Sequence, residues 1–183
     1  MNFFQKALEI SDTILTKEKF VKAIIQRGGW SEKNASGVGR AFFETLLPWI
    51  VQVLHTACNR VRRTPEEDAK YIYLYVALFN CMKRLIQLYC SSKTLHEIKP
   101  IFQAIGVAAL SLTFKAMDPD ENGDECFAMS EFSELETFCN GNCPTELLIE
   151  IEAEMFKLSD FTPCMDEYRE MSYVIRQAKL RVE

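Results

Sequence analysis

The sequence is poor in glycine, proline and histidine, and it has no long segment in which apolar and polar residues alternate. Of 183 residues, 7 are glycine, 6 are proline and 2 are histidine. The absence of a period-two pattern argues against a fold built on sheets. Apolar residues make up 48% of the chain, which excludes a disordered polar chain. We therefore expect a globular protein of the all-α class.

An excess of positive charge is also absent. The chain has 21 Lys and Arg against 26 Asp and Glu, a formal net charge of −5. This balance gives no general attraction to nucleic-acid phosphates, so we expect no nucleic-acid partner. Short basic clusters are expected to be solvated helix faces. They are Arg60, Arg62 and Arg63, and Lys83 with Arg84.

Long hydrophobic runs are lacking as well. Charged residues or glutamine interrupt each apolar run before the roughly 20 residues that a membrane-spanning helix needs. The amino-terminal segment contains Lys6 and Glu9, where a secretion signal would be apolar. The seven cysteines are odd in number and lack the paired spacings of a zinc module, which indicates free, mostly buried thiols. We expect a cytoplasmic protein without a membrane span.

Apolar residues recur at helical spacing through most of the chain. The strongest stripes run from Phe42 to Leu54 and from Tyr71 to Tyr89. Shorter helical patterns cover Phe3–Ile10, Lys17–Gln26, Ile98–Met117, Met129–Phe138, Thr145–Leu158 and Asp166–Leu180. The polar segment Ser91–Lys99, followed by Pro100, predicts a boundary between two helical halves, residues 1–92 and 93–183.

The segment with the clearest chemistry follows the pattern at 98–117. It reads Asp118-Pro-Asp120-Glu-Asn122-Gly123-Asp124, and then continues through Phe127 to Glu131 and Phe132. Calcium prefers six to eight oxygen ligands, which side chains at alternate positions of a curled loop supply. Gly123 allows the positive φ that such a curl requires. The predicted metal ligands are Asp118, Asp120, Asn122, Asp124 and Glu131.

The loop departs from the standard length. A twelve-residue loop that begins at Asp118 would end at Met129, which has no carboxylate. If Glu131 closes the site, residues 118–131 form a loop of 14 residues with two extra residues between Gly123 and Phe127. Asp124 or Glu125 would then be placed to add an oxygen. The alternative is an acidic, solvated turn between two helices.

On these residues, the sequence resembles the EF-hand superfamily, and its size and layout resemble invertebrate sarcoplasmic calcium-binding proteins and calexcitins. The resemblance is clearest over residues 101–171, through Phe114–Asp118 and Glu131–Phe132. It implies paired EF-hands, that is, four helix–loop–helix units in two packed halves. The second half would contain the one candidate calcium loop, and residues 1–92 would form a degenerate pair.

The other three loops implied by the resemblance look degenerate. Lys19 stands where the first loop would need its closing glutamate, and Arg60, Arg62 and Arg63 occupy the second loop. Three cations repel a divalent ion. The fourth hand, within Met155–Tyr168, is shortened, has no glycine and contains Pro163 near the strand that would pair the two loops.

Two functions remain in view. The first is a calcium-binding protein with a single sensor or structural site of sarcoplasmic or calexcitin type. The second is a calcium-independent helical module that binds a partner protein helix. Catalysis is the weakest interpretation, because it rests only on His55 three residues before Cys58, without an orienting acid. We expect no enzyme activity.

Overall fold

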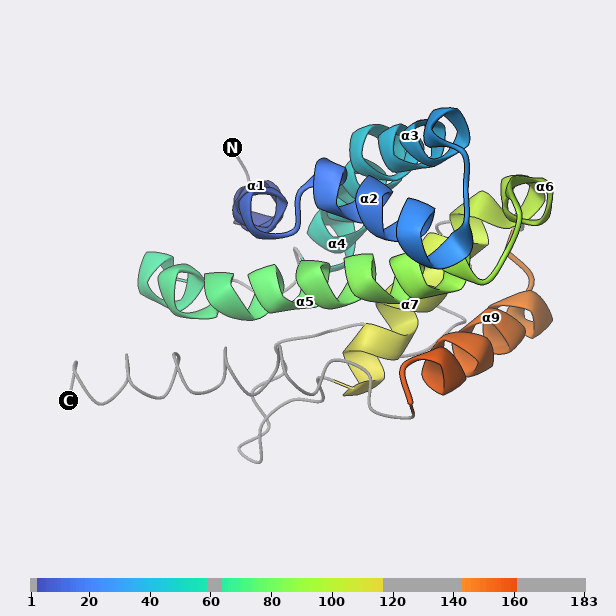
Figure 1. The fold of residues 1–183 in the computed structure, drawn as a ribbon. Helices are drawn as coiled ribbons and strands as arrows, with labels where there is room; N and C mark the ends of the chain where they lie inside the picture. The colour runs from blue at the N-terminus through green and yellow to red at the C-terminus, as the bar shows by residue number, and fades with distance from the viewer. Residues whose placement is uncertain (1–2, 59–63, 117–142, 161–183) are drawn as a thin grey trace.

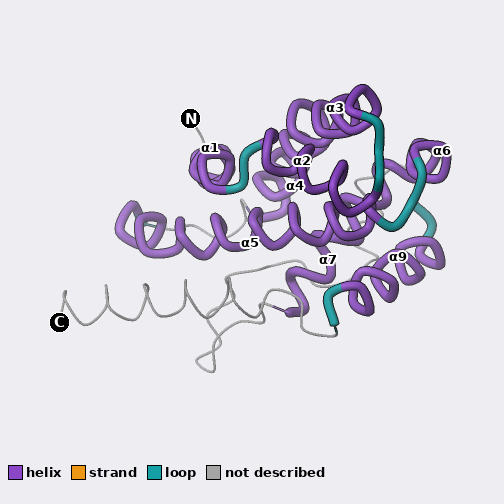
Figure 2. The backbone as a smooth tube through the Cα atoms, viewed as in Figure 1, coloured by secondary structure: helices purple, strands orange, loops and turns teal. Residues whose placement is uncertain are grey.

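The computed structural model describes residues 3–58, 64–116 and 143–160, apart from the side chains of residues 57, 58, 67, 68 and 70. Within these ranges the chain forms helices and short connections, and no strand (Figure 2). The all-α prediction is therefore confirmed. The helices are α1 (Phe3–Ile14), α2 (Lys17–Gly28), α3 (Glu32–Arg40), the π-helix η1 (Ala41–Leu46), α4 (Leu47–Cys58), α5 (Pro65–Ser91), α6 (Leu95–Ile98), the 3-10 turn η2 (Lys99–Ile101), α7 (Phe102–Ala116) and α9 (Thr145–Leu158).

Helix α5, with 27 residues, lies at the centre of the bundle (Figure 1). Helices α1 and α2 pack against it from one side, and α7 and α9 also contact it. Every residue from Leu74 to Lys83 is buried, because neighbouring helices cover α5 on all sides over this stretch. At the start of this buried stretch, the rings of Phe3 and Phe4 pack edge to face on the ring of Tyr75, with centroid distances of 5.3 and 4.9 Å.

Helix α7 is the second helix of the core. Each residue from Ala104 to Phe114 is buried. The sequence pattern had indicated an amphipathic helix before Asp118, and the structure shows one that is apolar on nearly every side. Such a helix belongs in a protein core or in a membrane.

The helical run Leu95–Ala116 is long and apolar enough to cross a membrane, by length and composition alone. The charged residues and glutamine that interrupt each apolar run had predicted no such helix. In the folded chain, 67% of its apolar window is buried inside the protein. Burial by neighbouring helices is the ordinary situation of a core helix, and it accounts for this composition.

Residues Glu32–Cys58 form one continuous helical run that changes pitch in the middle. The amide of Leu47 donates to the carbonyl of Phe42, five residues earlier, which defines the π-helix η1. Pro48 follows directly, and proline lacks the N–H that would bond the carbonyl of residue 44. A π turn before the proline lets the helix continue without that bond. At this point Gly106 of α7 allows Leu46 to approach closely, since a Cβ there would lie 2.5 Å from Leu46 Cδ2.

Most predicted helix positions are confirmed where the structure describes them. The pattern at Thr145–Leu158 coincides with α9, and the break at Gly28-Gly29 coincides with the end of α2, where Gly29 has φ +66°. The patterns at Met129–Phe138 and Asp166–Leu180 lie outside the described residues. Helix α3 was missed, since its sequence contains Gly37 and Gly39 and shows little apolar periodicity.

The predicted break at Ser91–Lys99 is shorter than expected. Thr94 caps α6: its side chain accepts from the amide of Glu97, and the Glu97 side chain accepts from the amide of Thr94. Pro100 lies in the 3-10 turn that joins α6 to α7, where a missing N–H is tolerated. The division into residues 1–92 and 93–183 stays a prediction. One core cluster combines apolar side chains from both sides of it, including Leu78, Ala108 and Leu148.

Candidate functional site

The predicted calcium ligands Asp118, Asp120, Asn122, Asp124 and Glu131 all lie outside the described residues. The described part of helix α7 reaches Ala116, two residues before Asp118. In the ranges 3–58, 64–116 and 143–160, no group of three or more His, Cys, Asp or Glu side chains is placed to hold a metal ion. The calcium site therefore stays a prediction from the sequence.

The end of α7 is tied to α9 by an ion pair. Lys115 Nζ lies 2.8 Å from Glu152 Oε1, and the Glu152 side chain is only 13% exposed. The second oxygen of this carboxylate, Oε2, is buried and has no hydrogen-bond partner among the described residues. A movement of the last turn of α7 would thus displace α9 or break this pair.

A second ion pair joins α9 to the chain just after α5. Lys93 Nζ lies 2.9 Å from Glu154 Oε1 and 5.5 Å from the centre of the Tyr89 ring. The bond to Glu154 raises the pKa of Lys93, and burial raises the pKa of Tyr89. Leu148, Ile151 and Met155 bury the inner side of α9 between these two pairs.

A buried polar cluster, which the sequence analysis missed, joins α1 to α5. Lys83 Nζ donates to Ser11 Oγ at 2.9 Å, to Asp12 Oδ1 at 2.5 Å and to the carbonyl of Leu15 at 3.2 Å. Ser11 in turn donates to Asn80 Oδ1 at 2.6 Å. We call these side chains, Ser11, Asp12, Asn80 and Lys83, the lysine cluster.

The expectation that Lys83 lies on a solvated face is wrong, because its side chain is only 2% exposed. Arg84, the next residue, is exposed. Burial lowers the pKa of Lys83, and the hydrogen bond and charge of Asp12 oppose that shift. The Nζ atom also lies 4.9 Å from the centre of the Phe43 ring in η1.

A serine beside a lysine is a combination that some hydrolases use. Here the chemistry does not support that role. Lys83 Nζ donates a hydrogen bond to Ser11 Oγ, whereas a general base would accept the proton of the serine hydroxyl. Ser11 is fully buried, so no substrate reaches its hydroxyl. The lysine cluster is best explained as a structural contact that satisfies the carboxyl end of α1.

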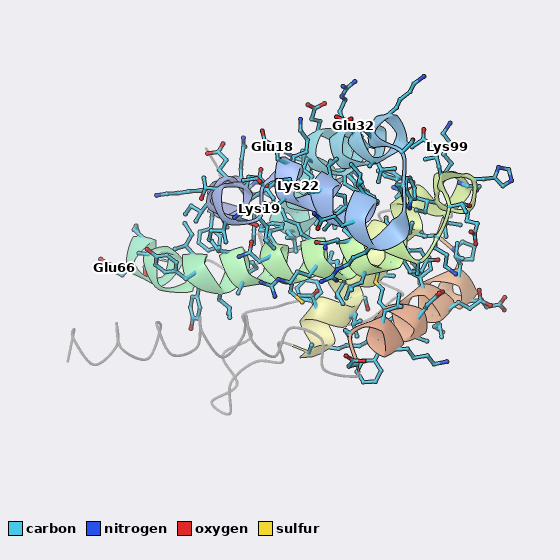
Figure 3. The ribbon with its side chains drawn as sticks, in the orientation of Figure 1. Glu18, Lys19, Lys22, Glu32, Glu66 and Lys99 are labelled. Atoms are coloured by element: carbon cyan, nitrogen blue, oxygen red, sulfur yellow. The ribbon has the colours of Figure 1, made fainter. Side chains whose placement is uncertain are left out.

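The first of the expected degenerate loops is very short. Helices α1 and α2 are separated only by Leu15 and Thr16, and Thr16 caps α2 by accepting from the amide of Lys19. Lys19, on α2 (Figure 3), donates from Nζ to the carbonyl of Ile14 at 3.1 Å. This connection therefore has no acidic loop in which a cation would bind. Arg60, Arg62 and Arg63 of the second expected loop lie outside the described residues.

The cysteines only partly agree with the expectation of free thiols. Cys90 and Cys143 are buried thiols outside any disulfide, as predicted, and burial raises the pKa of the Cys90 thiol far above its ordinary value. Cys81 differs from the prediction, since it is disulfide-bonded. For the weak catalytic interpretation, His55 is exposed, and the side chain of Cys58 lies outside the described residues.

No family of known proteins, no curated protein and no solved structure matches this chain. The EF-hand resemblance therefore depends entirely on the residues quoted above.

Proposed function

We propose that this chain binds one calcium ion in the loop Asp118–Glu131 and acts as a single-site sensor or structural binder. The observation that carries the proposal is the order Asp-x-Asp-x-Asn-Gly directly after a helix, with Glu131 placed to close the site. The described part of α7 reaches Ala116, so a helix leads toward the acidic segment, as in an ion-binding loop.

The proposal includes the EF-hand arrangement of four helix–loop–helix units. Three of the helix pairs involve described helices: α1 with α2, α4 with α5, and α7 with the segment that follows the acidic loop. The fourth would begin with α9. The proposal also places the protein in the cytoplasm and gives it no covalent chemistry.

The described contacts suggest how calcium would act beyond its loop. An ion that orders the residues after Ala116 would fix the last turn of α7, which includes Lys115. Lys115 pairs with Glu152 of α9 at 2.8 Å. Calcium would therefore change the stability of the α7–α9 contact, and α9 would be the helix that reports binding.

Calcium titration by isothermal calorimetry tests this proposal, with Glu131→Gln as the matched variant. This change removes the closing carboxylate and preserves side-chain size. The proposal expects one saturable site in the unmodified protein and at least about tenfold weaker binding in the variant, since a bidentate carboxylate is lost. Equal titrations for the two proteins, or no heat at about millimolar calcium, would refute it.

A second function is favoured by a different observation. We infer that a calcium-independent interaction module is the alternative, because α9 has an exposed apolar surface. Ile149 is 52% exposed and Phe156 is 37% exposed, although both are large apolar residues. If calcium has no effect on the protein, a partner that covers α9 becomes the leading explanation. Binding experiments in EDTA separate this function from the first.

A further inference from the structure

Helix α9 has an inner side that is firmly attached to the bundle. Leu148, Ile151 and Met155 are buried at spacings of three and four residues, and α9 packs on α7 and α5. Glu152 and Glu154, at the two opposite edges of this side, are paired with Lys115 and Lys93. The helix is therefore attached to the bundle by this side, and its opposite side faces away from the core.

The opposite side, which we call the α9 outer face, is exposed along the whole helix. Its members are Glu146, Ile149, Glu150, Ala153, Phe156 and Lys157. Ile149, Ala153 and Phe156 follow one another at spacings of four and three residues, so they form one apolar stripe. Two of the four large apolar side chains that are exposed in the described chain belong to this stripe.

The charges beside the stripe have one predominant sign. Glu146 and Glu150 precede and follow Ile149, and both are exposed. Neither carboxylate forms an ion pair with another described residue, unlike Glu152 and Glu154. Lys157 is the only cation of the face, at its carboxyl end.

We propose that the α9 outer face binds the apolar side of a basic amphipathic helix. The inference rests on the second proposed function, the interaction module. A helix of 14 residues is about 21 Å long, and its ridge fits the groove of another helix of similar length. Lysine or arginine beside the apolar side of that partner would meet Glu146 and Glu150.

A second copy of this chain is a poorer occupant. Pairing two α9 outer faces would bring four exposed glutamates together with two lysines. Like charges across an interface disfavour the wrong partner. The proposed complex, in which one helix packs on one helix, buries less surface than a standard interface. It therefore belongs to the weak, transient class of complexes.

Fluorescence anisotropy tests the proposal on the full chain in EDTA. The probe is a dye-labelled Leu/Lys amphipathic peptide of about 16 residues, and its Leu/Glu counterpart is the charge control. We expect Ile149→Asp to weaken binding of the Leu/Lys peptide at least about tenfold. Glu146→Gln with Glu150→Gln should weaken it less and reduce its dependence on salt.

The matched controls are Tyr73→Asp on α5, where the tyrosine is 47% exposed, and Glu18→Gln with Glu32→Gln on α2 and α3. These variants should bind the peptide as the unmodified protein does. Binding that is unchanged by Ile149→Asp, or weakened equally by the controls, overturns the proposal. Equal binding of the Leu/Glu peptide overturns its charge component. A dimer that Ile149→Asp dissociates would assign the face to a second copy instead.

Failure of this inference is distinguishable from failure of the calcium site, because the peptide assay is done in EDTA and the calcium titration uses Glu131→Gln. The unfolding midpoint of each variant is measured as well. Since Ile149 is exposed, Ile149→Asp should leave that midpoint nearly unchanged.

Discussion

The lysine cluster allows a sharp prediction about stability, in which a second substitution repairs the damage of the first. Asp12→Asn keeps the size of the side chain but removes the negative charge beside Lys83. The ammonium then stays buried, at 2% exposure, without a counter-charge. Loss of one partner from a fully buried pair costs about 3–5 kcal/mol. Asp12 is 38% exposed, so solvent screens part of the effect, and we expect a loss of about 2 kcal/mol.

Lys83→Met removes the charge and fills the same space with an apolar side chain. Ser11 still donates to Asn80, and the partly exposed Asp12 is free to reach water, so we expect a smaller loss of about 1 kcal/mol. The double variant Asp12→Asn with Lys83→Met has no buried charge at all. It should therefore be more stable than Asp12→Asn alone, which additive effects would not allow.

Urea unfolding followed by circular dichroism measures these differences. For a chain of this size, a loss of about 2 kcal/mol lowers the thermal midpoint by roughly 4–8 °C. Lys22→Met, an exposed lysine on α2 (Figure 3), is the control and should change stability by no more than about 0.5 kcal/mol. A double variant that is less stable than Asp12→Asn would refute the reasoning.

The same cluster predicts a dependence on pH. Because burial lowers the pKa of Lys83 in the folded state, the unfolded chain binds this proton more tightly. Stability attributable to Lys83 therefore rises as pH increases through the folded pKa toward the unfolded value of 10.5. Asp12→Asn removes the opposing charge and lowers the folded pKa of Lys83 further, so the stability of this variant should begin to rise at a lower pH than that of the unmodified protein.

Three further predictions concern other parts of the bundle. In α3, Gly39→Ala should destabilise the protein by about 1–3 kcal/mol, because a Cβ there would lie 2.5 Å from Val21 Cγ2. Gly37→Ala should instead stabilise the protein by about 0.5–1 kcal/mol, because a Cβ at that position would have no atom within 4 Å. Thermal unfolding of the two variants measures this contrast, and equal effects would contradict the prediction. The buried thiols of Cys90 and Cys143 should resist a thiol reagent at neutral pH until the protein is unfolded. Mass spectrometry of the labelled protein measures this reaction. Fast labelling of Cys90 in the folded protein would be inconsistent with its raised pKa. Hydrogen bonds from the backbone amide and then the hydroxyl of Thr94 lower the pKa of Glu97. Thr94→Ala keeps the amide and removes the hydroxyl, so an NMR titration should show the Glu97 pKa raised only part of the way toward 4.5, and an unchanged titration would rule out the hydroxyl as a cause. The stability that the pair contributes is present above the unfolded pKa and is lost as pH falls through the folded one.

Much of the secondary structure was determined by the sequence alone. Leu148, Ile151 and Met155 recur at helical spacing, and the pattern around them has the same bounds as α9. Gly29 marks the end of α2, because its positive φ is one that other residues rarely adopt. These features depend on neighbours within a few positions in the chain. They are therefore visible in the sequence.

The calcium loop is also a statement of sequence, and it remains one. Asp118, Asp120, Asn122, Asp124 and Glu131 form a local pattern of ligand types, which predicts chemistry without any knowledge of packing. Whether a loop of 14 residues brings these oxygens together is a question of geometry. The calorimetric experiment with Glu131→Gln decides it.

Only the tertiary structure decided the role of Lys83 and the composition of α7. Lys83 resembles any surface lysine in the sequence, and the residues that accept its hydrogen bonds, Ser11 and Asp12, lie about 70 positions earlier. The apolar run in α7 is compatible by composition with a membrane or with a core, and contact with α5 and α9 places it in a core. Burial arises from contacts between distant segments, so local periodicity indicates which residues share a helix face but not which helices cover that face.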